Sequence, residues 1–318
     1  MNKLKTFWQL LRDAGTGFRH HKILKLSASL AYYTIFSIGP MLLVIIFCSN
    51  LFWGKDAIEG RIFTQISGMI GKESAIQVQE IIKKAAVSGS SFSAIIGLVI
   101  LIVAATTVFI EMQDSINMIW NLKVKKTTGW WLTIKNRLLS FSIVAGLGFF
   151  LLVTLVLDAL LDGFMSKLQE LFPKITVIVI YVLNIFLTLV TSAALFAVIF
   201  KVLPDACIKW KDVIVGAFFT AVLFIFGKFC ISYYIKKSNL DSAYGAAGSI
   251  VVLLLWIYIS SVILYFGAEF TKVYALKFGS DIFPDKYAVM IRINSVESSE
   301  TSIQQNEQKS RLEQAHNK

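Results

Sequence analysis

The sequence has few charged residues. Only 16% of its 318 residues are Asp, Glu, Lys or Arg, whereas a soluble domain carries roughly a quarter. No polar stretch is long enough to form a soluble domain, and the longest polar-leaning segments are residues 54–91 and 279–318. This composition excludes an ordinary soluble protein. Hydrophobic residues make up 56% of the chain, and we expect this apolar excess to face lipid.

Residues typical of enzyme chemistry are also scarce. The histidines all lie in terminal segments: His20, His21 and His316. The three cysteines show no CxxC spacing: Cys48, Cys207 and Cys230. This spacing predicts neither a disulfide framework nor a zinc site. The sequence has no HxH, HExxH or phosphate-binding glycine loop, and no clustered His and carboxylate ligands for a metal nuclease. We therefore expect no enzyme, no metal site and no cofactor.

Long apolar runs dominate the chain instead. A helix needs about 20 apolar residues to span the hydrocarbon of a bilayer. Six stretches are long enough: Leu30–Trp53, Phe92–Asn117, Leu138–Leu161, Ile175–Phe200, Val213–Tyr234 and Ser249–Ala275. They do not alternate as the strands of a barrel would. The sequence predicts an all-α fold, a polytopic transmembrane bundle of six helices with short interfacial amphipathic helices.

The Lys and Arg residues fix the expected orientation. Of the 31 in the chain, 21 lie in the two termini and in the second and fourth connections between the predicted spans. Nine lie in the first, third and fifth connections, and Lys228 lies inside a span. Because cytoplasmic loops carry the excess of Lys and Arg, we expect both termini in the cytoplasm. The net charge of +11 would then face anionic headgroups rather than nucleic acid.

The predicted bundle divides the chain into three parts. Residues 1–29 form a cytoplasmic segment, 30–278 the six-helix transmembrane domain, and 279–318 a partly disordered cytoplasmic tail. Two connections show helical apolar stripes. The first stripe, beside basic residues that suit an anionic surface, is Leu4, Phe7, Trp8, Leu11 and Ala14. The second is Val78, Ile81, Ile82 and Ala85.

Breaks and charges within the spans are the candidate functional positions, since both are costly in lipid. Gly39 and Pro40 predict a kink, which either lines a substrate cavity or is a plain bend. Glu111 and Asp114 share one helical face. They form either a site for a cation, proton or polar substrate near the inner mouth, or a solvated helix end that pairs with Lys123 or Arg137.

Three further positions have more than one reading. Lys228 extends its charge toward the membrane surface, pairs with Asp158 or Asp162, or binds a headgroup phosphate or substrate. Tyr244 and Gly245 belong to a segment that is either a compact turn or an entry whose free amides meet an anion. Glu269 either pairs locally with Lys272 or acts as a gate residue.

Several short motifs occur in a specific order. They are Ala31-Tyr32-Tyr33-Thr34 leading to Ser37 and Pro40, Leu203-Pro204-Asp205, Tyr244-Gly245-Ala246, Leu255-Trp256-Ile257-Tyr258 and Gly267-Ala268-Glu269-Phe270. Over about residues 20–280 the chain resembles the YihY/BrkB family of bacterial inner-membrane proteins, once labelled ribonuclease BN. The resemblance implies six spans in the plasma membrane and suggests transport or lipid movement. The scarcity of catalytic residue types argues against a ribonuclease.

We therefore expect a transporter or a lipid-flippase-like protein. The candidate substrate or ion path is Tyr32, Gly39, Pro40, Glu111, Asp114, Lys228, Tyr244, Gly245 and Glu269. The alternative is a membrane scaffold or partner subunit, in which small residues of the fourth span pack against another protein: Ser192, Ala193, Ala194 and Ala197. Expected partners are membrane lipids, with anionic headgroups at the cytoplasmic face, and the sequence leaves a homo-oligomer open.

Overall fold

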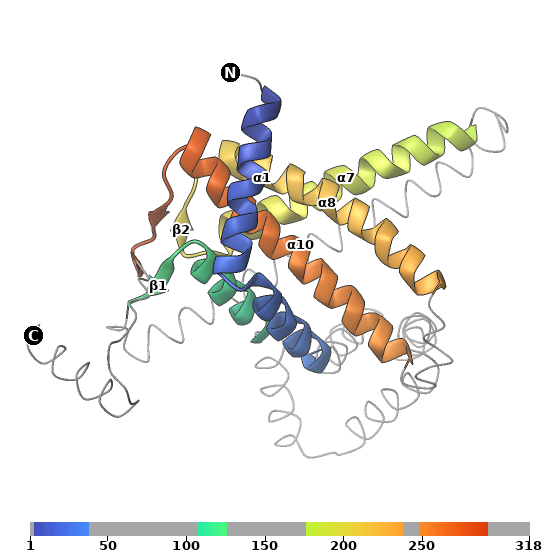
Figure 1. Ribbon diagram of the computed structural model, residues 1–318, viewed down its shortest axis with the longest axis horizontal. Helices are drawn as coiled ribbons and strands as arrows, with labels where there is room; N and C mark the ends of the chain where they lie inside the picture. The colour runs from blue at the N-terminus through green and yellow to red at the C-terminus, as the bar shows by residue number, and fades with distance from the viewer. Residues whose placement is uncertain (1–2, 38–106, 126–175, 238–247, 292–318) are drawn as a thin grey trace, which may run out of the picture.

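The computed structural model describes residues 3–37, 107–125, 176–237 and 248–291, and this part of the chain is mostly helical (Figure 1). The helices are α1 (Lys3–His20), a helix over 23–37, a helix over 107–119, α7 (Thr176–Val202), α8 (Trp210–Lys237) and α10 (Gly248–Phe278). The strands are β1 (Leu122–Val124), β2 (Ala206–Cys207), β3 (Phe283–Pro284) and β4 (Ala288–Met290).

Among the described residues, three helices are long and apolar enough to cross a membrane. Their apolar segments are Ile185–Val202 in α7, Trp210–Tyr234 in α8 and Ile250–Phe278 in α10. They confirm the fourth, fifth and sixth predicted spans as long apolar helices. The first and second predicted spans are described only over 30–37 and 107–117, and the third lies outside the described residues. The six-span bundle therefore stays a prediction.

The helices α8 and α10 pack through two reciprocal contacts between a glycine and a threonine. A Cβ added to Gly216 would lie 1.9 Å from Oγ1 of Thr271, and one added to Gly267 would lie 2.0 Å from Oγ1 of Thr220. Only glycine leaves room for these threonines, as in other close approaches of membrane helices. Each threonine hydroxyl donates to the glycine carbonyl one turn earlier in its own helix, at 2.7 Å. The hydroxyls of both threonines are therefore satisfied within their own helices.

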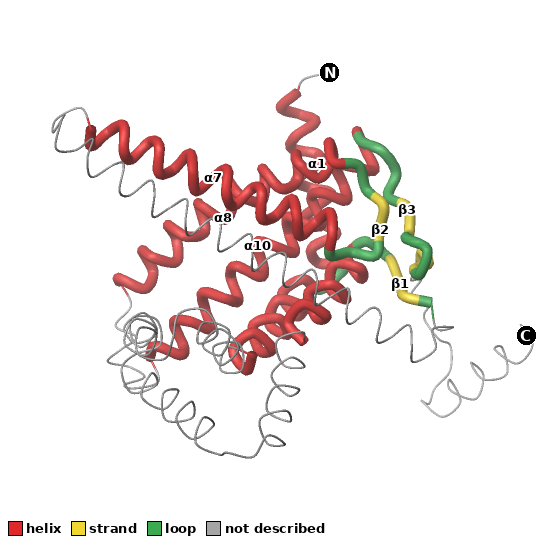
Figure 2. Tube along the Cα trace, turned by 180° about the vertical axis from the view of Figure 1, so that it is seen from behind, coloured by secondary structure: helices red, strands yellow, loops and turns green. Residues whose placement is uncertain are grey.

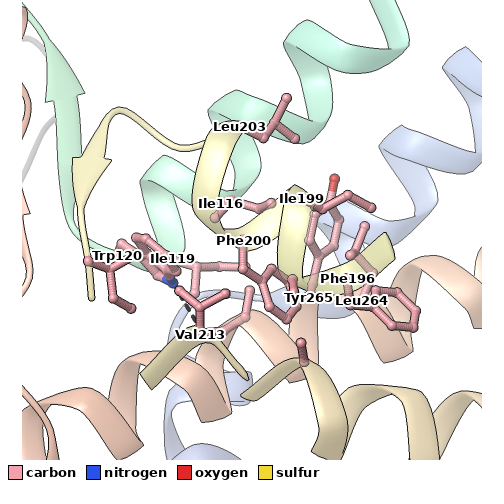
Figure 3. Close-up of a cluster of buried hydrophobic side chains, with 14 of the residues drawn as sticks. Ile116, Ile119, Trp120, Phe196, Ile199, Phe200, Leu203, Val213, Leu264 and Tyr265 are labelled. Carbon is pink, nitrogen blue, oxygen red and sulfur yellow. Dashed lines mark hydrogen bonds between the residues drawn. The ribbon is translucent and has the colours of Figure 1, made fainter. Parts of the chain in front are cut away.

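The apolar core lies where α7, α8, α10 and the helix over 107–119 meet (Figure 3). Phe200 and Tyr265 are fully buried there, and Ile116 contacts the same cluster. Trp120 joins the core through its ring and donates from Nε1 to the carbonyl of Ala268 at 3.1 Å. This bond fixes the end of the 107–119 helix against the C-terminal half of α10.

The four strands gather at one end of the helices (Figure 2). β1 pairs antiparallel with β4, and β2 pairs antiparallel with β3. The sequence analysis predicted no strands, because two- and three-residue strands are too short to show alternation. β1 and β2 belong to the second and fourth connections between the predicted spans, and β3 and β4 belong to the start of the predicted tail. The distribution of Lys and Arg predicts that all three segments lie on the cytoplasmic side of the membrane. Part of the predicted tail is therefore ordered, up to 291, and the rest lies outside the described residues.

Candidate functional site

The first helix forms an elbow with the second. α1 ends at His20, the next helix begins at 23, and Lys22 between them has a positive φ of 52°. Figure 1 shows α1 crossing α10, whereas the helix over 23–37 follows the general direction of α10. Leu10 and Ala14 of α1 are buried against Phe270 of α10. The elbow brings His21 to the side of α10.

The centre of the candidate site is the carboxylate of Glu269, which is only 2% exposed. Its Oε2 atom lies 2.8 Å from Nδ1 of His21, whose side chain is also buried. Its Oε1 atom lies 3.7 Å from Nζ of Lys272, one turn further along α10. Gly17 of α1 leaves room for the carboxylate, because an added Cβ would lie 2.1 Å from Oε1. α1, the turn that follows it and α10 thus enclose the carboxylate of Glu269.

The partners of Glu269 are held in turn by the 107–119 helix and the turn after it. Nζ of Lys272 donates to the carbonyl of Ile119 at 2.7 Å. Nε2 of His21 lies 3.4 Å from Oδ1 of Asn121, which itself has a positive φ of 57°. Charges removed from water are costly unless they are paired and hydrogen-bonded. The junction therefore depends on α1, α10 and this turn together.

A second polar cluster lies around Asp205, in the loop between α7 and α8. Its carboxylate accepts hydrogen bonds from Asn117 at 2.7 Å and Gln113 at 3.2 Å, and its amide donates to Oδ1 of Asn117 at 2.9 Å. Its carbonyl accepts from the amide of Asp285 at 3.0 Å. Burial, and secondarily the charge of Asp285, raise the pKa of Asp205, although the two amide hydrogen bonds oppose this. The cluster ties three segments together.

The described residues of the predicted substrate or ion path differ in their exposure to solvent. Glu269 is buried in the junction, whereas Lys228 of α8 and Tyr32 are exposed. Tyr32 packs its ring against Phe36, with centroids 4.6 Å apart. The predicted positions Gly39, Pro40, Tyr244 and Gly245 lie outside the described residues.

The acidic pair of the second predicted span is near the Asp205 cluster. Asp114 is exposed and Glu111 is partly buried. Asp114 interacts electrostatically with Glu111 and with Asp205. Asp205 is thus a third acid near this pair, and Arg137, which was weighed with Lys123 as a basic partner, lies outside the described residues. Glu269, the other predicted acid, belongs to a separate cluster.

Sequence reasoning missed His21, Gly17 and Asn121, which complete the Glu269 junction. It set the histidines aside because they lie near the chain ends. No spacing in the sequence links His21 to Glu269, since the contact depends on how α1 crosses α10. Within the described ranges, no group of three or more His, Cys, Asp or Glu residues could hold a metal ion.

Long apolar helices, an interhelical glycine-threonine crossing and a charged junction at one helix end define a helical integral membrane protein. The chain belongs to the Virulence factor BrkB family, whose profile matches residues 14–286.

Several membrane proteins are similar to this chain along most of their length. A UPF0761 membrane protein of Pseudoalteromonas atlantica is 24% identical over 77% of this chain and 78% of its own. One from Tolumonas auensis is 27% identical over 79% and 80%. The chain spans only 54% of a relative from Ralstonia nicotianae and 61% of one from Alcanivorax borkumensis. No solved structure matches the chain.

Proposed function

We propose that this protein transports a substrate across the membrane, in a transporter or lipid-flippase-like role, and that it is not an enzyme. The observation that carries the proposal is the buried carboxylate of Glu269, held between His21 and Lys272. Ionisable groups buried within transmembrane segments are costly and commonly mark substrate or proton pathways. Glu269 lies within the apolar segment of α10.

The arrangement of the junction suits a site that changes during transport. The two partners of Glu269 come from different places: Lys272 from its own helix, and His21 from the elbow after α1. A movement of α1 would remove one partner and leave the other. Such a two-position contact gives a carboxylate two environments, which a transport cycle requires.

The scaffold alternative has less support from the packing. Of the small residues expected to meet another protein, Ala197 is buried in the core of this chain and Ala193 packs against the same core. Part of that face is therefore used within the molecule. It is not available as a whole to a partner subunit.

The test is transport by the purified protein in vesicles. One set of vesicles carries a fluorescent phosphatidylethanolamine in one leaflet, and another contains a pH-sensitive dye and an imposed pH gradient. We expect the protein to move at least one probe faster than protein-free vesicles do. Glu269→Gln should remove this activity, while Asp13→Asn, in an exposed ion pair, should keep it. Folded protein that moves neither probe would contradict the proposal.

A further inference from the structure

The helix α1 has two different faces. One face is buried on α10 through Leu10, Ala14 and Gly17. The opposite face is exposed along its whole length, and its members recur at helical spacing: Lys5, Trp8, Gln9, Arg12, Thr16 and Arg19. The exposed face is therefore a continuous stripe, which we call the outer face of α1.

The outer face of α1 is basic and carries one large aromatic ring. The helix has four Lys or Arg residues and one acid, Asp13. That acid lies 3.3 Å from Nζ of Lys277, so its charge is offset within the molecule. Trp8 is 71% exposed, more than any other large apolar side chain in the described part of the chain. Basic residues around an exposed tryptophan are typical of a membrane-surface helix.

The position of α1 places this face near the bilayer surface. α10 contains an apolar segment long enough to span the membrane. Figure 1 shows α1 crossing α10 near the end where the strands gather, while the following helix turns to follow α10. A helix that crosses the end of a span, rather than running beside it, lies close to the plane of the headgroups.

We propose that α1 binds anionic phospholipid headgroups through its outer face, with Lys5, Arg12 and Arg19 contacting phosphates and Trp8 inserted at the interface. The occupant is a lipid surface because the junction at Glu269 and the packing on Phe270 hold α1 across the C-terminal part of the apolar segment of α10. Attraction between basic side chains and anionic lipid is screened by salt. This inference stands apart from the proposed transport.

The experiment measures how deeply Trp8 sits in lipid. The full-length protein is reconstituted into vesicles of brominated phosphatidylcholine, with and without brominated phosphatidylglycerol, and tryptophan fluorescence is recorded. Subtracting the signal of Trp8→Phe isolates Trp8 from the other six tryptophans. We expect quenching of Trp8 that is stronger with phosphatidylglycerol, and we expect 1 M salt to remove this extra quenching.

A triple variant tests the charges. Lys5→Gln, Arg12→Gln and Arg19→Gln together should remove the extra quenching by phosphatidylglycerol. Lys237→Gln, at the far end of α8, is the matched control and should leave it unchanged. Thermal unfolding shows that each variant is folded. Trp8 that is not quenched in either vesicle would overturn the proposal. Equal quenching in both vesicles, insensitive to salt and to the triple variant, would overturn it as well.

Discussion

Nδ1 of His21 lies 2.8 Å from Oε2 of Glu269, and both side chains are buried although they come from opposite ends of the chain. This contact joins the elbow after α1 to the membrane-spanning helix α10. Because Lys272 approaches the same carboxylate from α10 itself, Glu269 has one partner in the elbow after α1 and one in its own helix.

Removing the carboxylate should destabilise the protein. Glu269→Ala leaves His21 and Lys272 buried without their acid, and breaking a buried pair in this way costs about 3–5 kcal/mol. Thermal unfolding of the purified protein in detergent measures the loss. Asp13→Ala is the control, because its pair with Lys277 is exposed and worth at most about 1 kcal/mol. Equal melting temperatures for Glu269→Ala and the native protein would show that the junction does not form.

Two glycines of α1 provide a matched pair of substitutions. Gly17→Ala would place a methyl group against the Glu269 carboxylate, whereas nothing lies within 4 Å of a Cβ added to Gly15. We expect Gly17→Ala to cost about 1–3 kcal/mol through overpacking. Gly15→Ala should instead stabilise the helix by about 0.5–1 kcal/mol, because alanine has the higher helix propensity.

The same melting measurement on both glycine variants tests the predicted opposite signs. If both variants shift the melting temperature in the same direction, α1 does not pack on α10 as described.

The crossing of α8 and α10 predicts a graded response to Gly→Ala substitution. Gly216 and Gly267 each face the branched side chain of a threonine, near its Cβ as well as its hydroxyl. Gly227 meets chiefly the flexible Cδ1 atom of Ile263, which can rotate away. We expect Gly216→Ala and Gly267→Ala each to cost about 1–3 kcal/mol and Gly227→Ala clearly less. A loss for Gly227→Ala as large as for the other two would contradict this packing.

The Asp205 cluster predicts a pH-dependent difference in stability. At pH 7, Asp205→Asn should cost about 1–2 kcal/mol, because Gln113 donates to Oδ1 and Asn117 to Oδ2, and the amide replaces one of these oxygens with an NH2 group that cannot accept. The folded protein raises the pKa of Asp205, chiefly by burial. The stability that this shift contributes is therefore present at low pH and is lost as pH rises through the folded-state pKa.

Acidification from pH 7 toward pH 4 should therefore favour the native protein over Asp205→Asn. Denaturant unfolding of both proteins across this range measures the difference in the free energy of unfolding. A difference that narrows on acidification would mean that the folded state lowers the pKa of Asp205 instead.

The sequence predicted much of the fold and only part of the junction. Apolar length was sufficient to identify α7, α8 and α10, because the hydrocarbon thickness sets the length of a span. Glu269 was a candidate because a charged residue within an apolar run is costly to place in lipid. His21 was not, because it lies in a terminal segment outside the predicted spans. Only the crossing of α1 over α10 buries it, and sequence periodicity does not determine that crossing.

The paired glycines and threonines of α8 and α10 show the same limit. Each helix contains a Gly-xxx-Thr spacing, in Gly216–Thr220 and in Gly267–Thr271, so each could form a close contact. The spacing does not reveal which glycine meets which threonine. That pairing depends on the direction and register of the two helices, which only the structure provides.

The central claim is that His21 and Glu269 act together in transport, and a double-mutant cycle of transport rates tests it most directly. His21→Asn, Glu269→Gln and the double variant are reconstituted into vesicles beside the native protein, and the rate is measured for whichever probe the native protein moves. Groups that act as a unit give strongly non-additive losses. We predict that each single variant loses the activity and that the double variant is no worse. Native rates in folded His21→Asn and Glu269→Gln would contradict the account.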